Sequence, residues 1–166
     1  MHKIELLVLD IDGVLTDGRL YYTDRGETMK VFHVRDGHGI KLLMHSGVQV
    51  AVISGRRSAA VTARMRELKI HHVVQGCRDK VAALLALTQR LGIKPLACAC
   101  MVDDTPDLPL MSAVGFAAAV ADAHPLVLSA AHWVSIAPGG QGAVRELTDA
   151  ILRARSLLRQ APQHVV

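Results

Sequence analysis

The stretch that decides the fold is LDIDGVLTDG, residues 9–18. An apolar run at residues 4–9 leads into it and predicts a buried strand. Asp10 and Asp12 follow that strand directly, in a turn that contains glycine. Ligands of open α/β sheets bind beyond the carboxyl ends of the strands, so both carboxylates are expected to face one pocket. Such aspartates can serve the turn alone, but two close carboxylates repel each other and are stable chiefly with a cation or a shared proton.

Short apolar runs alternate with longer helical patterns along the rest of the chain, which favours a Rossmann-like parallel sheet with helices on both faces. We predict further strands at residues 48–53, 72–75, 98–102, 116–120 and 132–136. We predict helices at residues 38–45, 58–68, 79–91, 106–113 and 142–159.

One segment breaks this alternation. Two β-prone runs, residues 20–23 and 28–32, flank Asp24-Arg25-Gly26 and predict a β-hairpin that protrudes at about residues 19–33. The expected architecture is a single α/β domain over residues 1–166, with a loose tail at about residues 161–166.

The composition argues against two classes of partner. The 19 Lys and Arg residues exceed the 15 Asp and Glu residues only mildly, and aromatic residues make up 3% of the chain, which does not favour nucleic-acid binding. The uncharged run at residues 108–121 is shorter than the roughly 20 residues that span a bilayer. Glu5 and Asp10 interrupt any secretory signal, and the three cysteines form no CxxC motif. We therefore expect a cytoplasmic protein with reduced thiols.

A second acidic cluster follows the predicted strand at residues 98–102. It contains Asp103, Asp104 and Asp107. Aspartates near Pro106 also suit the start of a helix, and this alternative explains Asp104 or Asp107 by itself. It does not explain the matching acidic end of the first strand. Carboxylate oxygens that converge from two strand ends are typical ligands of Mg²⁺.

Two other predicted strands end in residues that suit a phosphate. Ser54, Gly55 and Arg56 follow residues 48–53, where a hydroxyl and backbone N–H groups could bind an anion at a helix start. Ser54 could instead be a plain helix cap. Lys80 follows the strand at residues 72–75, although a lone lysine early in a helix is usually solvated.

Taken in chain order, these strand ends resemble the four motifs of the haloacid dehalogenase-like superfamily of phosphotransferases. The resemblance implies that Asp10 is the nucleophile and forms an aspartyl-phosphate. It implies that Asp12 protonates the leaving group and then activates water. Ser54 and Lys80 would bind the non-bridging phosphate oxygens.

The same resemblance implies a Mg²⁺ cofactor. Its ligands would be Asp10, the backbone carbonyl of Asp12, and Asp103, with Asp104 or Asp107 supporting them. The ion would offset the repulsion between the nucleophile and the phosphate.

A narrower resemblance covers nearly the whole chain. The stretches that carry it are DGVLTDG at 12–18, GETMKVFHVRDGHGIK at 26–41, ISGR at 53–56, QGCRDK at 75–80 and GGQGAVREL at 139–147. These stretches are similar to the 3-deoxy-D-manno-octulosonate 8-phosphate (KDO 8-phosphate) phosphatase family. That resemblance implies a Mg²⁺-dependent homotetramer in the cytoplasmic route to lipopolysaccharide. It also implies that no cap domain is present and that the hairpin builds the assembly and roofs a neighbour's active site.

The resemblance also implies substrate-binding residues. A related branch that acts on nine-carbon sugar acid 9-phosphates carries an acidic residue where this chain has Arg56, whose guanidinium could meet the sugar carboxylate. Further matching positions are Thr16, Arg35, Gly55 and Arg64, the last at a position thought to reach a neighbour's site. Thr16 and Arg35 can also be purely structural.

Three residues depart from the family's usual pattern. They are Val102 in place of glycine, Gln141 in place of arginine, and His33 in place of asparagine. Two alternatives therefore stay open: a phosphatase of another sugar acid phosphate, and a non-catalytic tetramerisation module. The presence of all five catalytic and metal positions argues against the second alternative.

Overall fold

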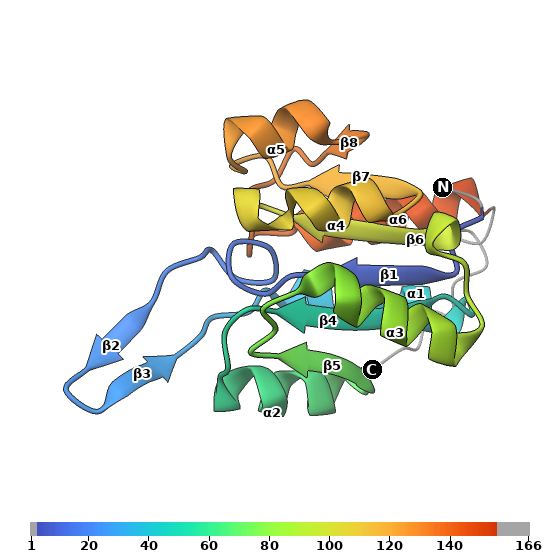
Figure 1. Cartoon of the computed structure of the whole chain (residues 1–166). Helices are drawn as coiled ribbons and strands as arrows, with labels where there is room; N and C mark the ends of the chain where they lie inside the picture. The colour runs from blue at the N-terminus through green and yellow to red at the C-terminus, as the bar shows by residue number, and fades with distance from the viewer. Residues whose placement is uncertain (1–2, 156–166) are drawn as a thin grey trace.

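Six parallel strands form one sheet, in the order β5-β4-β1-β6-β7-β8 (Figure 1). This computed structural model describes the backbone of residues 3–155, and their side chains except those of residues 27 and 28. The strands are β1 (Leu6–Leu9), β4 (Gln49–Ser54), β5 (His72–Gln75), β6 (Cys98–Val102), β7 (Phe116–Ala119) and β8 (Trp133–Val134). The predicted α/β class with a parallel sheet is confirmed.

The centre of the sheet is apolar and fully covered. All residues of β1 and β6 are buried, as continuous apolar strands with helices on both faces should be. Leu9 at the end of β1 is in register with Val52 of β4 and Met101 of β6. This register brings the residues that follow the three strands to one edge of the sheet.

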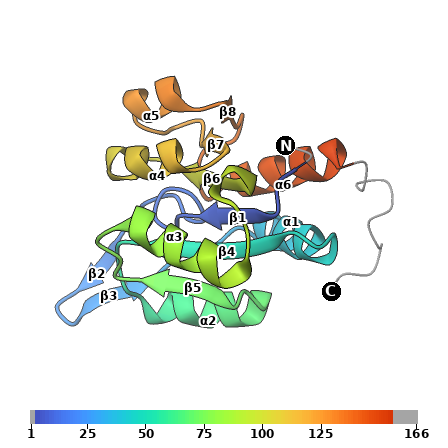
Figure 2. The ribbon, with the colours of Figure 1, turned by 45° about the vertical axis from the view of Figure 1, so that its right-hand side comes forward.

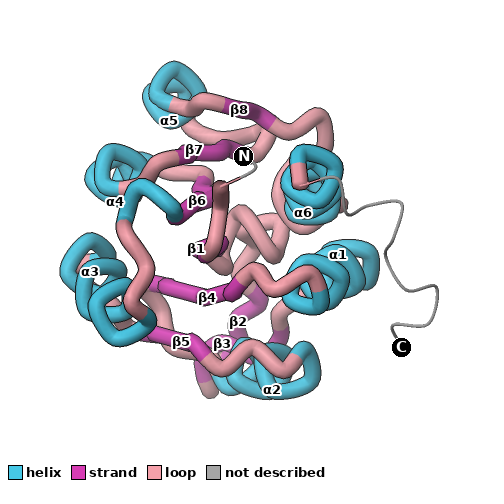
Figure 3. Tube along the Cα trace, turned by 90° about the vertical axis from the view of Figure 1, so that its right-hand side faces the viewer, coloured by secondary structure: helices cyan, strands magenta, loops and turns pink. Residues whose placement is uncertain are grey.

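The helices lie in two layers, which Figure 3 shows along the sheet. One face carries α3 (Lys80–Leu91), α4 (Leu108–Ala113) and α5 (Pro125–Ala130), and the other carries α1 (Val34–His45), α2 (Ala59–Leu68) and α6 (Ala143–Ala154). Two 3-10 turns, η1 (Pro95–Ala97) and η2 (Thr105–Asp107), precede β6 and α4. No helix within residues 3–155 is both long and apolar enough to cross a membrane.

Local capping explains several helix ends. The Asp79 carboxylate accepts a hydrogen bond from the Ala82 backbone N–H at 2.9 Å, which begins α3 immediately before Lys80. The buried Asp36 carboxylate of α1 accepts a hydrogen bond from the Arg145 backbone N–H at 2.8 Å. This contact ties the first turn of α6 to α1 across a long separation in sequence.

The hairpin, β2 (Tyr21–Thr23) and β3 (Gly26–Met29), extends beyond the edge where the parallel strands end (Figures 1 and 2). Thr23 pairs with Gly26 across a tight turn, and Gly26 has a φ of +104° that favours glycine. Between β1 and α1 the structure contains only this hairpin and its connecting loops. The prediction of a protruding hairpin and no cap domain is confirmed for the described residues.

Several predicted boundaries are wrong. Helix α1 begins at Val34, not at residue 38, because His33 caps it by accepting a hydrogen bond from the Arg35 backbone N–H at 3.3 Å. Helix α5 was not predicted, since its six residues are too short to show a period. Strand β8 has two residues in place of five, and the second hairpin strand is Gly26–Met29 in place of 28–32. The predicted helix beyond residue 155 and the tail at 161–166 lie outside the described residues.

Candidate active site

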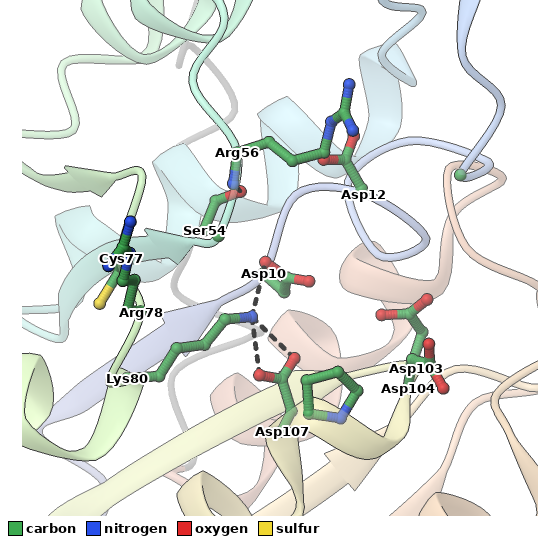
Figure 4. A pocket seen from close by; sticks show the side chains of 13 residues that line it. Asp10, Asp12, Ser54, Arg56, Cys77, Arg78, Lys80, Asp103, Asp104 and Asp107 are labelled. Atoms are coloured by element: carbon green, nitrogen blue, oxygen red, sulfur yellow. Dashed lines mark hydrogen bonds and ion pairs between the residues drawn. The ribbon is translucent and has the colours of Figure 1, made fainter.

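A cavity of about 380 Å³ opens at the carboxyl ends of the strands (Figure 4). It is lined by Asp10, Asp12, Gly18, Ser54, Gly55, Arg56, Cys77, Arg78, Lys80, Asp103, Asp104, Pro106 and Asp107. The structure thus gathers every residue predicted for catalysis and metal binding. These residues come from strand ends, helix starts and loops that lie far apart in the sequence.

Lys80 is the electrostatic centre of the cavity. Its Nζ lies 3.0 Å from Asp10 Oδ1 and 2.7 Å from Asp107 Oδ1 (Figure 4). Burial lowers the pKa of Lys80, but attraction to the two carboxylates outweighs this effect and leaves the pKa above its ordinary value. The interpretation of Lys80 as a solvated lysine is therefore wrong, because its side chain is only 13% exposed and holds an ammonium charge between two acids.

Three carboxylates form a group that could hold a metal ion. Oxygen atoms of Asp10, Asp103 and Asp107 all lie within 4.8 Å of one another. Burial, with repulsion from Asp107, raises the pKa of Asp10 from 3.8 to about 6 although Lys80 opposes the change. Burial and repulsion from Asp10 and Asp107 raise the pKa of Asp103 to about 7. The single ammonium group of Lys80 therefore does not neutralise the negative charge of the three carboxylates.

The residues present fit Mg²⁺. Carboxylate oxygens are the donors that this hard cation prefers, and a divalent charge would offset the burial and the repulsion that together raise both pKa values. Gly13 leaves room for the cluster, because a Cβ at its position would overlap the Asp103 carboxylate. Its φ of +87° also disfavours other residues.

Asp12 is held apart from this cluster. Lys30 Nζ donates a hydrogen bond to its Oδ1, and Arg56 Nε lies 3.7 Å from its Oδ2. Figure 4 shows the Asp12 side chain beside Arg56, away from the Asp10 carboxylate. The two aspartates of the first motif therefore have different surroundings. Asp10 shares a buried cation with a second acid, whereas Asp12 contacts two cations.

The remaining polar residues resolve the capping alternatives. The N-cap position of α2 is Ser58, so Ser54 is not its N-cap and instead ends β4 with a buried hydroxyl. That hydroxyl accepts a hydrogen bond from the Arg56 backbone N–H at 3.4 Å. Asp104 does start a helical turn, since its Oδ1 accepts a hydrogen bond from the Thr105 N–H at 2.7 Å. Asp107 makes no capping bond and is paired with Lys80 instead.

Comparison with known proteins decides the family. A sequence model of haloacid dehalogenase-like hydrolases matches residues 69–145. The 3-deoxy-D-manno-octulosonate 8-phosphate phosphatase of Yersinia pestis is 46% identical over 159 residues, which are 96% of this chain and 85% of that protein. The chain belongs to the KDO 8-phosphate phosphatase family.

Solved structures of KDO 8-phosphate phosphatases have the same fold. The Yersinia pestis crystal structure matches with a TM-score of 0.96 and 44% identity, over 99% of this chain and 89% of that chain. The Moraxella catarrhalis phosphatase, in complex with a magnesium ion, a phosphate ion and KDO, matches with a TM-score of 0.92 and 40% identity. That match covers 96% of this chain and 91% of the Moraxella chain.

Three residues for which the resemblance predicted a role in substrate binding do not line the cavity of their own chain. The Thr16 hydroxyl is buried and donates a hydrogen bond to the Ile11 carbonyl at 3.3 Å, so it supports the loop after β1. Arg35 is exposed on the first turn of α1. Arg64 pairs with Glu67 at 2.8 Å and does not line the cavity.

The departures from the family pattern leave the site intact. Val102 is fully buried in β6, His33 caps α1 and Gln141 is exposed, and none of the three lines the cavity. Two charged residues in or next to the site were missed by sequence analysis. Arg78 lines the cavity two positions before Lys80, and Lys30 reaches Asp12 from the end of the hairpin. Only their places within QGCRDK and GETMKVFHVRDGHGIK could have drawn attention to them.

Proposed function

We propose that this protein is a Mg²⁺-dependent phosphatase that hydrolyses KDO 8-phosphate to KDO and inorganic phosphate. The observation that carries the proposal is that the side chains of Asp10, Lys80, Asp103 and Asp107 meet in one cavity. A buried carboxylate beside a lysine and further acids suits covalent phosphoryl transfer, in which one difficult hydrolysis becomes two easier displacements. Membership in the KDO 8-phosphate phosphatase family supplies the substrate.

In the first displacement, a carboxylate oxygen of Asp10 bonds to phosphorus as the bond from phosphorus to the sugar oxygen breaks. Asp12 gives a proton to the departing sugar oxygen, which leaves as the free alcohol. In the second displacement, Asp12 takes a proton from water. The water oxygen then bonds to phosphorus, and the aspartyl-phosphate breaks to release phosphate and regenerate Asp10.

Asp10, Asp103 and the backbone carbonyl of Asp12 would hold Mg²⁺, with Asp107 and Asp104 supporting them. When bound, the ion offsets the negative charge of the nucleophile and of the phosphate and orients both groups. Lys80 contributes beside it, because its ammonium group already touches the nucleophile and is held there by Asp107.

Substrate binding would use both rims of the cavity. The Ser54 hydroxyl, the Gly55 backbone and Lys80 would bind the non-bridging phosphate oxygens. Arg56, which lines the cavity beside Asp12, would meet the sugar carboxylate. Thr16 would support substrate binding indirectly by holding the loop after β1, and Arg35 would do so from the first turn of α1. Arg64 would serve a neighbour's site, since its guanidinium lies 6.0 Å from the Phe32 ring at the foot of the hairpin.

We propose a cytoplasmic homotetramer in the route to lipopolysaccharide, with residues 1–166 as a single domain. The hairpin region supports an assembly role, because it exposes large apolar side chains that water would disfavour as a contiguous patch. Tyr22 is 59% exposed, Met29 49%, Val31 52% and Val34 75%. Without a cap domain, a neighbouring subunit would be needed to exclude water from the cavity.

The test is phosphate release from KDO 8-phosphate, measured with Mg²⁺ and with EDTA, beside a nine-carbon sugar acid 9-phosphate. We expect fast, Mg²⁺-dependent release from the octulosonate alone. Release from the nine-carbon substrate alone would contradict the substrate assignment but keep the chemistry. A folded tetramer that releases phosphate from neither would favour the non-catalytic tetramerisation module.

A further inference from the structure

Lys30 is a buried cation at the foot of the hairpin. Its side chain is only 1% exposed, and its Nζ donates a hydrogen bond to Asp12 Oδ1. Lysine is almost never fully buried unless it is paired, so this position serves a specific contact. Lys30 does not line the cavity. Its ammonium group therefore does not contact a substrate bound in the cavity, and Asp12 is the cavity residue to which it is hydrogen-bonded.

The other strand of the hairpin reaches the same carboxylate. The Tyr22 hydroxyl of β2 accepts a hydrogen bond from Arg56 Nη2 at 2.7 Å. Arg56 Nε lies 3.7 Å from Asp12 Oδ2. One oxygen of Asp12 is thus held from the end of β3, and the other faces an arginine that β2 holds. Asp12 and Arg56 lie side by side above Ser54 in Figure 4.

We propose that Lys30 is a positioning residue for proton transfer, and that it makes the placement of Asp12 depend on the hairpin. The inference rests on the proposed function, because it assumes that Asp12 gives a proton to the leaving sugar oxygen. Asp12 stands on a loop, and a carboxyl that must meet one particular oxygen loses efficiency when its side chain rotates freely. The hydrogen bond from Lys30, which lies outside the cavity lining, restricts the rotation of the Asp12 side chain.

The experiment compares two leaving groups in Lys30→Met and Lys30→Arg. KDO 8-phosphate releases a strongly basic sugar oxygen that needs a proton, whereas p-nitrophenyl phosphate releases a stable phenolate that needs little help. The quantity to compare is kcat/KM, because it covers only the steps up to departure of the leaving group. The later hydrolysis of the aspartyl-phosphate is common to both substrates and does not enter it.

We expect K30M to lower kcat/KM for KDO 8-phosphate by about 100-fold, the lower end of the usual contribution of a general acid. For p-nitrophenyl phosphate we expect a loss smaller than about threefold. K30R keeps a cation near Asp12 and should recover most of the loss on the sugar phosphate. Lys94→Met is the matched control, since Lys94 is exposed near the opposite edge of the sheet, and it should change neither value.

An equal loss on both substrates would overturn the inference, because a merely structural lysine would damage the whole cavity alike. Circular dichroism and the elution volume of each variant identify misfolded protein. If p-nitrophenyl phosphate turns over too slowly to measure, K30R is compared with K30M on KDO 8-phosphate alone. Equal activity of these two variants would then overturn the inference. Wild-type protein that hydrolyses neither substrate would instead contradict the proposed function.

Discussion

The carboxylate of Asp103 occupies the space that any side chain on Gly13 would need. Gly13 follows the two aspartates of the first motif, and Asp103 follows the neighbouring strand β6, so the absence of a side chain at Gly13 lets the two loops approach each other. The glycine in the turn after β1 therefore has two roles: it allows the positive φ of the turn, and it leaves space for a carboxylate of the proposed metal site.

Gly13→Ala should therefore displace Asp103 and abolish Mg²⁺-dependent phosphate release. Gly47→Ala is the matched control, because Gly47 has nearly the same φ, +88° against +87°, and has open space around it. Both variants should lose about 1 kcal/mol or more of stability from backbone strain. Only G13A should lose Mg²⁺ binding by calorimetry, and similar binding in the two variants would contradict the role of Gly13.

Asp10→Asn should abolish turnover while it leaves the fold and assembly intact. The amide has nearly the same volume as the carboxylate but is not a nucleophile toward phosphorus. Asp149→Asn is the control, because Asp149 lies outside the cavity, where it pairs with Arg145 along α6, and the change should affect activity little. Phosphate release and elution volume check both variants, and measurable turnover in D10N would rule out the aspartyl-phosphate route.

Without metal, the carboxylate cluster should make stability fall as the pH rises. The pKa values of Asp10 and Asp103 are raised from 3.8 to about 6 and about 7. Between pH 3.8 and about 7, the folded protein holds protons that the unfolded chain releases. The free energy of unfolding therefore decreases as the pH rises through this window. The decrease should be on the order of a few kcal/mol, and Mg²⁺ should oppose it at pH 8 because the ion binds the folded state.

Asp103→Asn isolates this effect, since it removes one ionisable group and keeps all others. In EDTA, D103N should be more stable than the wild type at pH 8 and similar to it at pH 5, by urea unfolding. It should also lose its response to Mg²⁺ and its activity. Equal stability of the two proteins at both pH values would show that ionisation of Asp103 does not destabilise the folded protein.

Arg56→Ala should raise KM for KDO 8-phosphate by about 10- to 100-fold, as expected for a lost hydrogen bond to a charged group. KM for p-nitrophenyl phosphate should change little, because that substrate has no carboxylate. Arg66→Ala, an exposed arginine in the last turn of α2, serves as the control. The same rise in KM for both substrates would place Arg56 at the phosphate and not at the sugar acid.

Most of the fold could be predicted because burial leaves a clear pattern. Residues 50–53 of β4 and all of β6 form continuous apolar runs, since both faces of these strands are covered. The start of α1 and all of α5 could not be predicted. The first turns of α1 contain Gly37 and Gly39, which weaken a helical pattern, and α5 is too short to establish a period.

The site residues could be predicted for a topological reason. Parallel strands present their carboxyl ends at one edge, so polar residues that follow apolar runs must converge there even though they are far apart in the sequence. This reasoning placed Asp10, Ser54, Lys80 and Asp103 together. It could not separate ligands from supporting residues, and the structure places Asp107 within the same oxygen cluster as Asp10 and Asp103.

The sequence by itself thus determined the class of fold, the edge of the sheet that carries the chemistry, and the residue types available there. Local patterns suffice for this, because hydrophobic periodicity and chain order depend on neighbours along the chain. Only the tertiary structure decided which side chains pair in and beside the cavity: Lys80 with Asp107, and Lys30 with Asp12. Both pairs join residues far apart in sequence, and their contacts follow from how separate elements pack.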